Sequence, residues 1–157
     1  MGVSTDGHIC FGIAFEDGFE FPWDTEESDQ DIDSWWVYGV LGSKHSFELY
    51  DEKGNYINGV KPAQEDTDRY YDEKRQFEAK NKKIPIQLVN YCSGDYPMYI
   101  LAVPRTYLSC SRGYPADFDP SALTVTEEEK AALLQFCQDH GIEHGAEPKW
   151  LLSSYWG

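Results

Sequence analysis

The sequence predicts an α+β fold, formed as one domain over residues 1–157, in which a mostly antiparallel sheet has about three helices packed against it. Two observations favour this class. Strand-like and helix-like segments follow one another in the order β-α-ββ-α-β-β-α-β, without the strict alternation that a parallel sheet requires. The composition, 41% hydrophobic and 15% aromatic, supplies a core for a chain of 157 residues. No repeat and no Gly/Ser-rich linker marks a domain boundary.

The first strand is expected at residues 7–15. One of its faces carries small side chains, which predicts that a helix or loop passes close over Gly12 and Ala14. The other face is bulky, so the sheet is expected to be covered on both sides. The bulky residues alternate along the strand: Ile9, Phe11, Ile13 and Phe15.

An acidic loop at about residues 16–33 follows this strand, and a short helix is expected at residues 32–41. Apolar residues four apart form one stripe of this helix, and Gly42 is placed to end it. Residues 47–50 and 55–57 flank a short turn with a glycine, which predicts a hairpin.

The middle of the chain is expected to hold a surface helix and a second hairpin. Residues 66–80 have a thin apolar stripe and opposite charges four positions apart, which is typical of a helix on the surface. Residues 84–92 and 98–103 are continuously apolar, as strands in the middle of a sheet are. The Ser-Gly-Asp segment between them favours an antiparallel connection.

The last helix has clear start and stop signals. Thr126 and Glu129 have the spacing of a capping box, and Gly141 is placed where a left-handed residue ends a helix. Residues 150–156 are expected to form a final strand. If this strand lies at an exposed edge, it could pair with a second copy, so a homodimer is one expected assembly.

The formal net charge of −15 argues against several partners. Proteins that bind nucleic acid neutralise phosphates with basic residues, so direct nucleic-acid binding is not expected, and an anionic membrane is disfavoured for the same reason. No apolar run is long enough for a membrane span, and the first residues do not resemble a signal peptide. Four widely spaced cysteines are expected to be reduced thiols, which favours the cytoplasm.

The acidic segment is the main candidate for function. Nine acids and no base lie between Glu16 and Asp33, and aromatic residues alternate with them. Crowded carboxylates resemble a polyanion and would attract the basic groove of a host protein that handles nucleic acid, with aromatic residues as anchors. The alternative is a solvated loop over a core of the same aromatic residues. The expected partner-binding residues are Trp23, Asp24, Glu26, Glu27, Asp29, Asp31, Asp33, Trp35 and Trp36.

A second hypothesis is a small-molecule or nucleotide sponge. Tyrosine rings would line its pocket, and two arginines would bind phosphate, because they are nearly the only cations between Lys83 and Lys130. The residues expected in this site are Tyr91, Tyr96, Tyr99, Tyr107, Tyr114, Arg105 and Arg112.

A third hypothesis is an enzyme that depends on cysteine and histidine. Cys137, His140 and His144 have a spacing that could hold zinc, but Gly141 is expected to end the helix before the last of them. The other candidates are Cys92 as a nucleophile with His8 as its base, and Asp6 with His8 as an acid–base pair. A buried thiol, a turn and a strand-edge hydrogen bond account for the same residues. We therefore expect a non-enzymatic protein without metal or cofactor.

Four segments resemble a group of small acidic proteins of tailed bacteriophages and prophages. They are MGVSTDGHICFGI at the start, VNYCSGDYPMYILAV in the middle, RGYP at Arg112 to Pro115, and WLLSSYW at the end, together about a quarter of the chain. The resemblance implies a phage gene product that acts in the bacterial cytoplasm, and it brings no catalytic residues with it. By analogy, small acidic phage proteins often block host defence, which favours an anti-defence or anti-CRISPR inhibitor.

Overall fold

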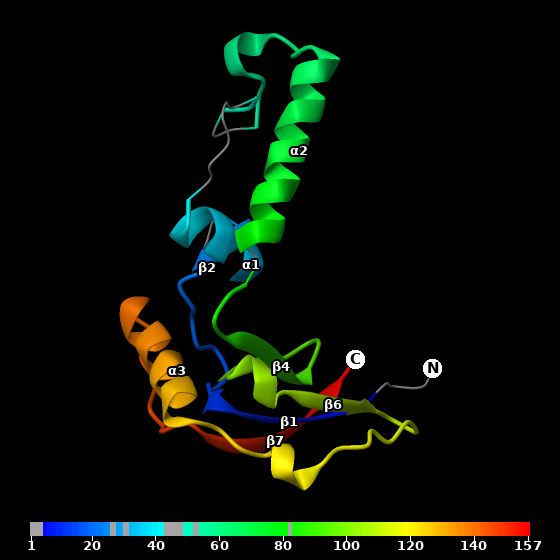
Figure 1. Cartoon of the computed structure of the whole chain (residues 1–157), viewed down its shortest axis with the longest axis vertical. Helices are drawn as coiled ribbons and strands as arrows, with labels where there is room; N and C mark the ends of the chain where they lie inside the picture. Colours follow the sequence, from blue (N-terminus) through cyan, green and yellow to red (C-terminus); the bar gives the residue numbers. More distant parts are fainter. Residues whose placement is uncertain (1–4, 26–27, 30–31, 43–48, 52–53, 82) are drawn as a thin grey trace. The chain divides into compact units, whose positions relative to one another are not determined.

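The computed structural model describes residues 5–25, 28–29, 32–42, 49–51, 54–81 and 83–157 (Figure 1). The contacts within the chain group it into two compact units. We call Met1–Asp29 together with Pro85–Gly157 the sheet unit, and Gln30–Ile84 the inserted unit. The sequence predicted one domain over residues 1–157.

The sheet unit confirms the predicted α+β class. Its five-stranded sheet has the order β5-β4-β7-β1-β6, and all neighbouring strands are antiparallel except the parallel pair β4 and β7. Two short strands, Asp24–Thr25 (β2) and Ser28–Asp29 (β3), form a separate pair. The strands of the larger sheet are β1 (Thr5–Ala14), β4 (Gln87–Ser93), β5 (Pro97–Ala102), β6 (Leu108–Ser111) and β7 (Lys149–Trp156).

The larger sheet closes on itself. In addition to β4, strand β5 pairs with β1, so β1, β7, β4 and β5 form a ring of hydrogen-bonded strands. Gly12 permits the closure, because a Cβ atom there would lie 2.2 Å from the carbonyl oxygen of Leu101. The predicted close approach over Gly12 is therefore real, but strand β5 makes it rather than a helix or loop.

A short 3-10 helix, Pro104–Thr106, separates β5 from β6, and both strands pair with β1. The buried Thr106 hydroxyl fills the break in the ladder: it accepts a hydrogen bond from the Phe11 N–H (2.9 Å) and donates one to the Val103 carbonyl (2.7 Å). The chain can therefore bend between β5 and β6 while the Phe11 N–H and the Val103 carbonyl both keep a hydrogen-bond partner.

The interior of the closed sheet is apolar at its centre. Cys10, Val89, Ile100 and Ala102 are buried there, and the half-buried Tyr91, Tyr107 and Leu151 pack against them. Strand β7 lies between β1 and β4. This strand pairs with β1 along its whole length but with β4 only at Tyr155 and Trp156, so the edge that was expected to be exposed is covered at its end alone.

Helix α3 (Glu127–Asp139) has the predicted start and end. The Thr126 hydroxyl accepts from the Glu129 N–H and the Glu129 carboxylate accepts from the Thr126 N–H, which completes the capping box. Gly141 has a φ of 66°, as expected for the residue after a helix. The buried face of α3 consists of Leu133, Phe136 and Cys137.

The inserted unit contains α1 (Ile32–Ser34), which continues as a π-helix over Trp35–Val40, and α2 (Gln64–Asn81). The predicted helices at 32–41 and 66–80 are confirmed at these positions, although π-helical turns were not expected. Of the predicted hairpin, residues 47–48 and 52–53 lie outside the described residues, and the bridge between Tyr50 and Tyr56 supports the pairing.

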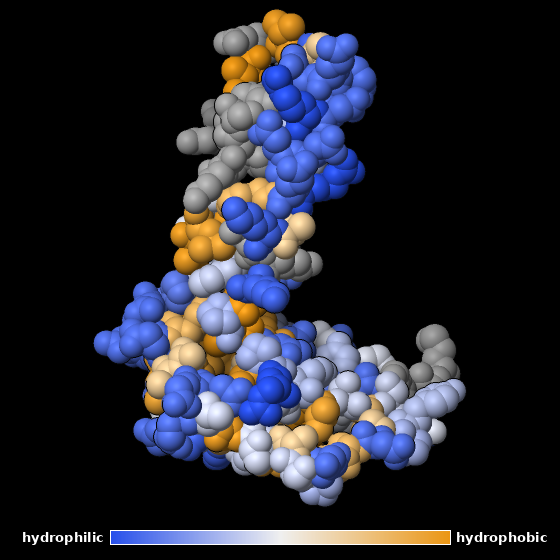
Figure 2. Space-filling model, in the orientation of Figure 1, coloured by the Kyte–Doolittle hydropathy of each residue, from blue (hydrophilic) through white to orange (hydrophobic). Residues whose placement is uncertain are grey.

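Helix α2 has no buried side chain between Gln64 and Lys80, and its visible face is hydrophilic (Figure 2). Val37 and Leu49 are the buried hydrophobic residues found in the described part of the inserted unit, whereas the sheet unit holds the others. None of the helices in the described residues combines the length and apolar character needed to span a membrane.

Candidate functional site

The beginning of the acidic segment lies on a cluster of aromatic rings. Phe21 is central: its ring centroid lies 5.0 Å from that of Phe15, 4.8 Å from that of Phe19 and 4.6 Å from that of Trp23, which stacks on it. The ring of Tyr99 on β5 meets Phe21 edge to face. These contacts bury Phe15, Phe21 and Trp23 and attach the segment to the sheet.

Backbone hydrogen bonds fix the shape of the same segment. The Phe15 N–H donates to the Tyr99 carbonyl (2.9 Å), which extends the contact of β1 with β5. The Phe21 N–H donates to the Asp24 carboxylate (2.8 Å), and the Asp24 N–H donates to the Phe21 carbonyl (2.9 Å). Residues 15–24 therefore form an ordered turn over buried aromatic rings, which agrees with the alternative of a loop over a core of these residues.

The carboxylates of this segment point outward while its aromatic rings point inward. Glu16, Asp17, Glu20 and Asp24 are all exposed. Within the described part of the chain, none of the four forms an ion pair with a lysine or an arginine. We call these four residues the acidic turn. Only Asp24 was among the predicted partner-binding residues; Glu16, Asp17 and Glu20 were not. The alternation of acids and aromatics in EDGFEFPWD is the signal that could have indicated these three.

The predicted partner-binding residues divide between the two units. Trp23 is 4% exposed and belongs to the core of this chain, so it is not available as an anchor for a partner. Asp24 is part of the acidic turn, and Asp29 lies on β3 of the sheet unit. Asp33, Trp35 and Trp36 are half-buried on α1 and the π-helix of the inserted unit. Glu26, Glu27 and Asp31 lie outside the described residues.

Most of the negative charge belongs to the sheet unit. It holds 17 of the 28 acidic residues and 4 of the 13 basic residues, so it accounts for −13 of the net charge of −15. Two of its four cations are paired with its own acids: Arg105 with Glu129, and Lys130 with Glu127. The sheet unit is therefore strongly anionic over a small surface.

The tyrosines and arginines of the second hypothesis do not all share one wall, although Arg112 and Tyr114 line the same cleft of about 370 Å³ after β6. Tyr91 and Tyr99 lie on opposite faces of the hairpin of β4 and β5, because Tyr91 is opposite Met98 and Tyr99 is opposite Asn90. Tyr96 and Tyr114 are 70% and 77% exposed, and Tyr107 stacks on His8 in the interior. Arg112 is exposed on the turn after β6.

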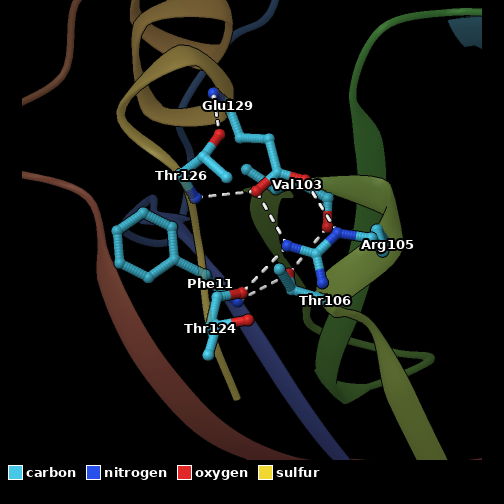
Figure 3. A network of polar contacts seen from close by, with 7 residues as sticks. All are labelled: Phe11, Val103, Arg105, Thr106, Thr124, Thr126 and Glu129. Carbon is cyan, nitrogen blue, oxygen red and sulfur yellow. Dashed lines mark hydrogen bonds and ion pairs between the residues drawn. The ribbon is translucent and has the colours of Figure 1, made fainter. Parts of the chain in front are cut away.

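Arg105 has a structural partner (Figure 3). Its guanidinium donates to both carboxylate oxygens of Glu129, each at 2.8 Å, and to the Thr124 carbonyl at 3.0 Å. The hydrogen bonds from Arg105 and from the Thr126 N–H lower the pKa of Glu129 to about 2. This network joins the 3-10 helix between β5 and β6 to the start of α3. It already pairs Arg105, one of the two arginines that were expected to bind phosphate.

The cysteine and histidine candidates are also separated. Cys137 is 1% exposed, and burial raises the pKa of its thiol to about 11. His140 caps α3, with its ring 4.6 Å from that of Phe136, while His144 Nδ1 lies 3.0 Å from the Ala146 carbonyl oxygen. Among the described residues, no three His, Cys, Asp or Glu side chains are grouped to hold a metal ion.

Asp6 and His8 belong to a polar group inside the closed sheet. His8 is 8% exposed, and its Nδ1 lies 2.9 Å from the Tyr107 hydroxyl. Burial lowers the pKa of His8, and the nearby Asp6 carboxylate opposes this shift. Within this polar group, Asp6 Oδ1, His8 Nε2 and Ser153 Oγ are buried and have no hydrogen-bond partner among the residues described.

The strand register explains why these three side chains are neighbours. His8 is directly opposite Ser153 on β7, and Asp6 lies two residues earlier on β1, so all three are on the same face. Ser153 also lines a cleft of about 650 Å³ together with Tyr91, Cys92 and Met98. The Cys92 side chain is exposed, and its φ of 75° is unusual for a residue other than glycine.

Comparison with known proteins gave no match to a protein family model, to a curated protein or to a solved structure.

Proposed function

We propose that this chain is a non-enzymatic, phage-encoded inhibitor that binds a host protein with a basic groove, such as a CRISPR or restriction effector, in the bacterial cytoplasm. The observation that carries the proposal is the acidic turn: Glu16, Asp17, Glu20 and Asp24 are exposed, and none has a cationic partner within the described residues. Like-charged groups held together destabilise a fold, so their retention favours an external partner with positive charge.

The anionic character of the sheet unit supports the same partner. Its net charge of −13 creates a potential that attracts a basic surface and repels nucleic acid. Electrostatic attraction of this kind raises the rate of association more than it lowers the rate of dissociation. The proposed complex should therefore form quickly at low salt and slowly at high salt.

The fixed shape of the acidic turn supports binding in a second way. Phe21 and Trp23 are buried beneath it, and Asp24 closes it through the hydrogen bond to the Phe21 N–H. A binding surface that is already ordered loses little conformational entropy when the partner binds. In this proposal the aromatic residues hold the carboxylates in place instead of contacting the partner.

The test compares two variants with the same change in net charge. E16Q/D17N/E20Q neutralises the acidic turn and keeps Asp24, because Asp24 holds the turn. D95N/E143Q/E147Q removes three exposed carboxylates elsewhere in the sheet unit. A partner captured from bacterial lysate at low salt would be used to measure association rates by surface plasmon resonance.

We expect the first triple variant to associate at least about tenfold more slowly, and the second to change by no more than about threefold. Equal losses in both variants would mean that net charge alone drives binding and would reject the acidic turn as the site. An unchanged rate in the first variant would reject the proposal, provided that circular dichroism shows the same fold in all three proteins.

A further inference from the structure

The cleft beside β4 is a second candidate site, and it differs from the acidic turn in chemistry. Strands β4 and β7 pair in parallel at Cys92 and Ser93 only, so the cleft opens where their ladder ends. It has a volume of about 650 Å³, in the range of small-molecule sites. Its lining residues are Tyr91, Cys92, Met98, Leu152, Ser153 and Ser154.

One polar atom of a residue that lines the cleft lacks a partner within the described chain. Ser153 Oγ is buried and unpartnered. His8, the residue directly opposite on β1, does not line the cleft. A buried polar atom without a partner destabilises the folded protein. A ligand that brings a hydrogen-bonding group to Ser153 would supply the missing partner. The unpartnered hydroxyl therefore favours binding of such a ligand in the cleft.

The walls of the cleft suit a flat apolar ring. The Tyr91 ring is held in one orientation because its hydroxyl donates to the Phe15 carbonyl (3.1 Å). Met98, the residue opposite Tyr91 in the β-ladder, adds a polarisable thioether that packs well on aromatic groups.

The charges around the cleft disfavour an anion. No lysine or arginine is among the residues that line it, and the Asp6 carboxylate lies on the same face as His8 and Ser153. The net charge of −13 on the sheet unit adds to this repulsion. A phosphate-bearing ligand such as a nucleotide is therefore a poor fit.

We infer that the cleft between β4 and β7 binds a small uncharged aromatic molecule that carries a hydroxyl group. The ring contacts Tyr91 and Met98, and the hydroxyl forms a hydrogen bond with Ser153 Oγ. This inference does not depend on the acidic turn or on its partner.

The exposed thiols provide a direct test in the unmodified protein. Cys92 lines this cleft, Cys110 lines two different clefts beside β6, both thiols are exposed, and Cys10 and Cys137 are buried. The rate at which N-ethylmaleimide modifies each cysteine would be measured by peptide mass spectrometry, with phenol, toluene or benzoate present. We expect phenol to slow modification of Cys92 and to leave Cys110 unchanged.

The three probes separate the parts of the inference. Toluene has the ring without the hydroxyl, so it should protect Cys92 only at concentrations about five- to tenfold higher, the loss expected for one hydrogen bond. Benzoate has the ring with a negative charge and should not protect. Equal protection of Cys92 and Cys110 by phenol, or no protection of Cys92, would overturn the inference.

A pair of serine variants tests the hydrogen bond. Ser153→Ala should weaken protection by phenol about five- to tenfold and leave protection by toluene unchanged, whereas Ser154→Ala should affect neither. Removing a buried hydroxyl that has no partner is not expected to unfold the protein. If phenol protects Cys92 equally well in Ser153→Ala, the assignment of Ser153 is wrong.

Discussion

At the scale of single residues, the carboxylates of this chain have two different surroundings. Glu129 accepts hydrogen bonds from Arg105 and from the Thr126 N–H, and these bonds lower its pKa to about 2. Glu16 and Asp17 are exposed and form no ion pair with any described residue. The first environment stabilises the fold, and the second leaves the charge available to a partner.

Glu129 predicts a specific dependence of stability on pH. The pKa of Glu129 is lower in the folded state than the value of about 4.3 in an unfolded chain. Its contribution to the free energy of unfolding is therefore complete above about pH 4.3. The contribution is lost as the pH falls towards about 2, because the unfolded chain takes up the proton first. We therefore expect Glu129→Gln to reduce the difference in unfolding free energy between about pH 6 and about pH 3.

The measurement is chemical denaturation followed by circular dichroism at several pH values. Glu127→Gln serves as the control, because Glu127 pairs with Lys130 on the surface of the same helix and its side chain is 84% exposed. An exposed pair contributes little, so the control should keep the wild-type pH profile. Identical profiles for both variants would contradict the role given to Glu129.

At the scale of elements, the closed sheet depends on how near β5 passes to β1. Residues with side chains cannot be accommodated at Gly12, because the Leu101 carbonyl oxygen and the Ala102 Cα would lie 2.2 and 2.9 Å from a Cβ atom. Both atoms belong to the backbone, so the strand itself would have to move. The Thr106 hydroxyl completes the same region by bonding to the main chain of β1.

Gly12→Ala is therefore expected to destabilise the protein by about 2–3 kcal/mol or more, since overpacking against a backbone has no low-energy relief. Gly145→Ala is the matched control, because a Cβ atom there would have no neighbour within 4 Å and the φ of Gly145 is not in the left-handed region. Thermal unfolding monitored by circular dichroism would compare the two variants. A Gly12→Ala protein as stable as the control would argue against closure through β5.

At the scale of the whole molecule, the two units differ in how they are stabilised. The buried hydrophobic residues belong mainly to the sheet unit, while Val37 and Leu49 are those found among the described residues of the inserted unit. Helix α2 relies instead on surface pairs such as Arg69 with Asp66, and such pairs contribute little. We infer that the inserted unit opens at a lower free energy than the sheet unit.

Amide hydrogen exchange measured by mass spectrometry tests this difference within one molecule. We expect amides in the middle of α2 to exchange at least about tenfold faster than those of β1 and β5, because local opening of α2 exposes little apolar surface. Equal protection of α2 and β1 would show that the two units unfold together. If peptides from α2 are not recovered, exchange would be measured in peptides that contain Tyr38. The Tyr38 hydroxyl donates a hydrogen bond to Glu78 of α2, so this region reports on the same unit.

Much of the local structure was predictable from sequence. The alternation along β1, the capping box of α3 and the apolar runs of β4 and β5 are signals between near neighbours in the chain, and they predicted these elements correctly. Strand β6 was missed, because its four residues, Leu-Ser-Cys-Ser, are too short and too polar to show a pattern. The alternation of acids and aromatics indicated the acidic turn but not which aromatic residues are buried.

The sequence by itself indicated most of the longer strands and helices, and it placed most of the net negative charge near the beginning of the chain. The tertiary structure decided that β7 is an inner strand, that Trp23 lies in the core, and that Asp6, His8 and Ser153 are neighbours. The physical reason is that hydrophobic periodicity acts over a few residues, whereas strand order and register depend on contacts between residues that are far apart in the chain.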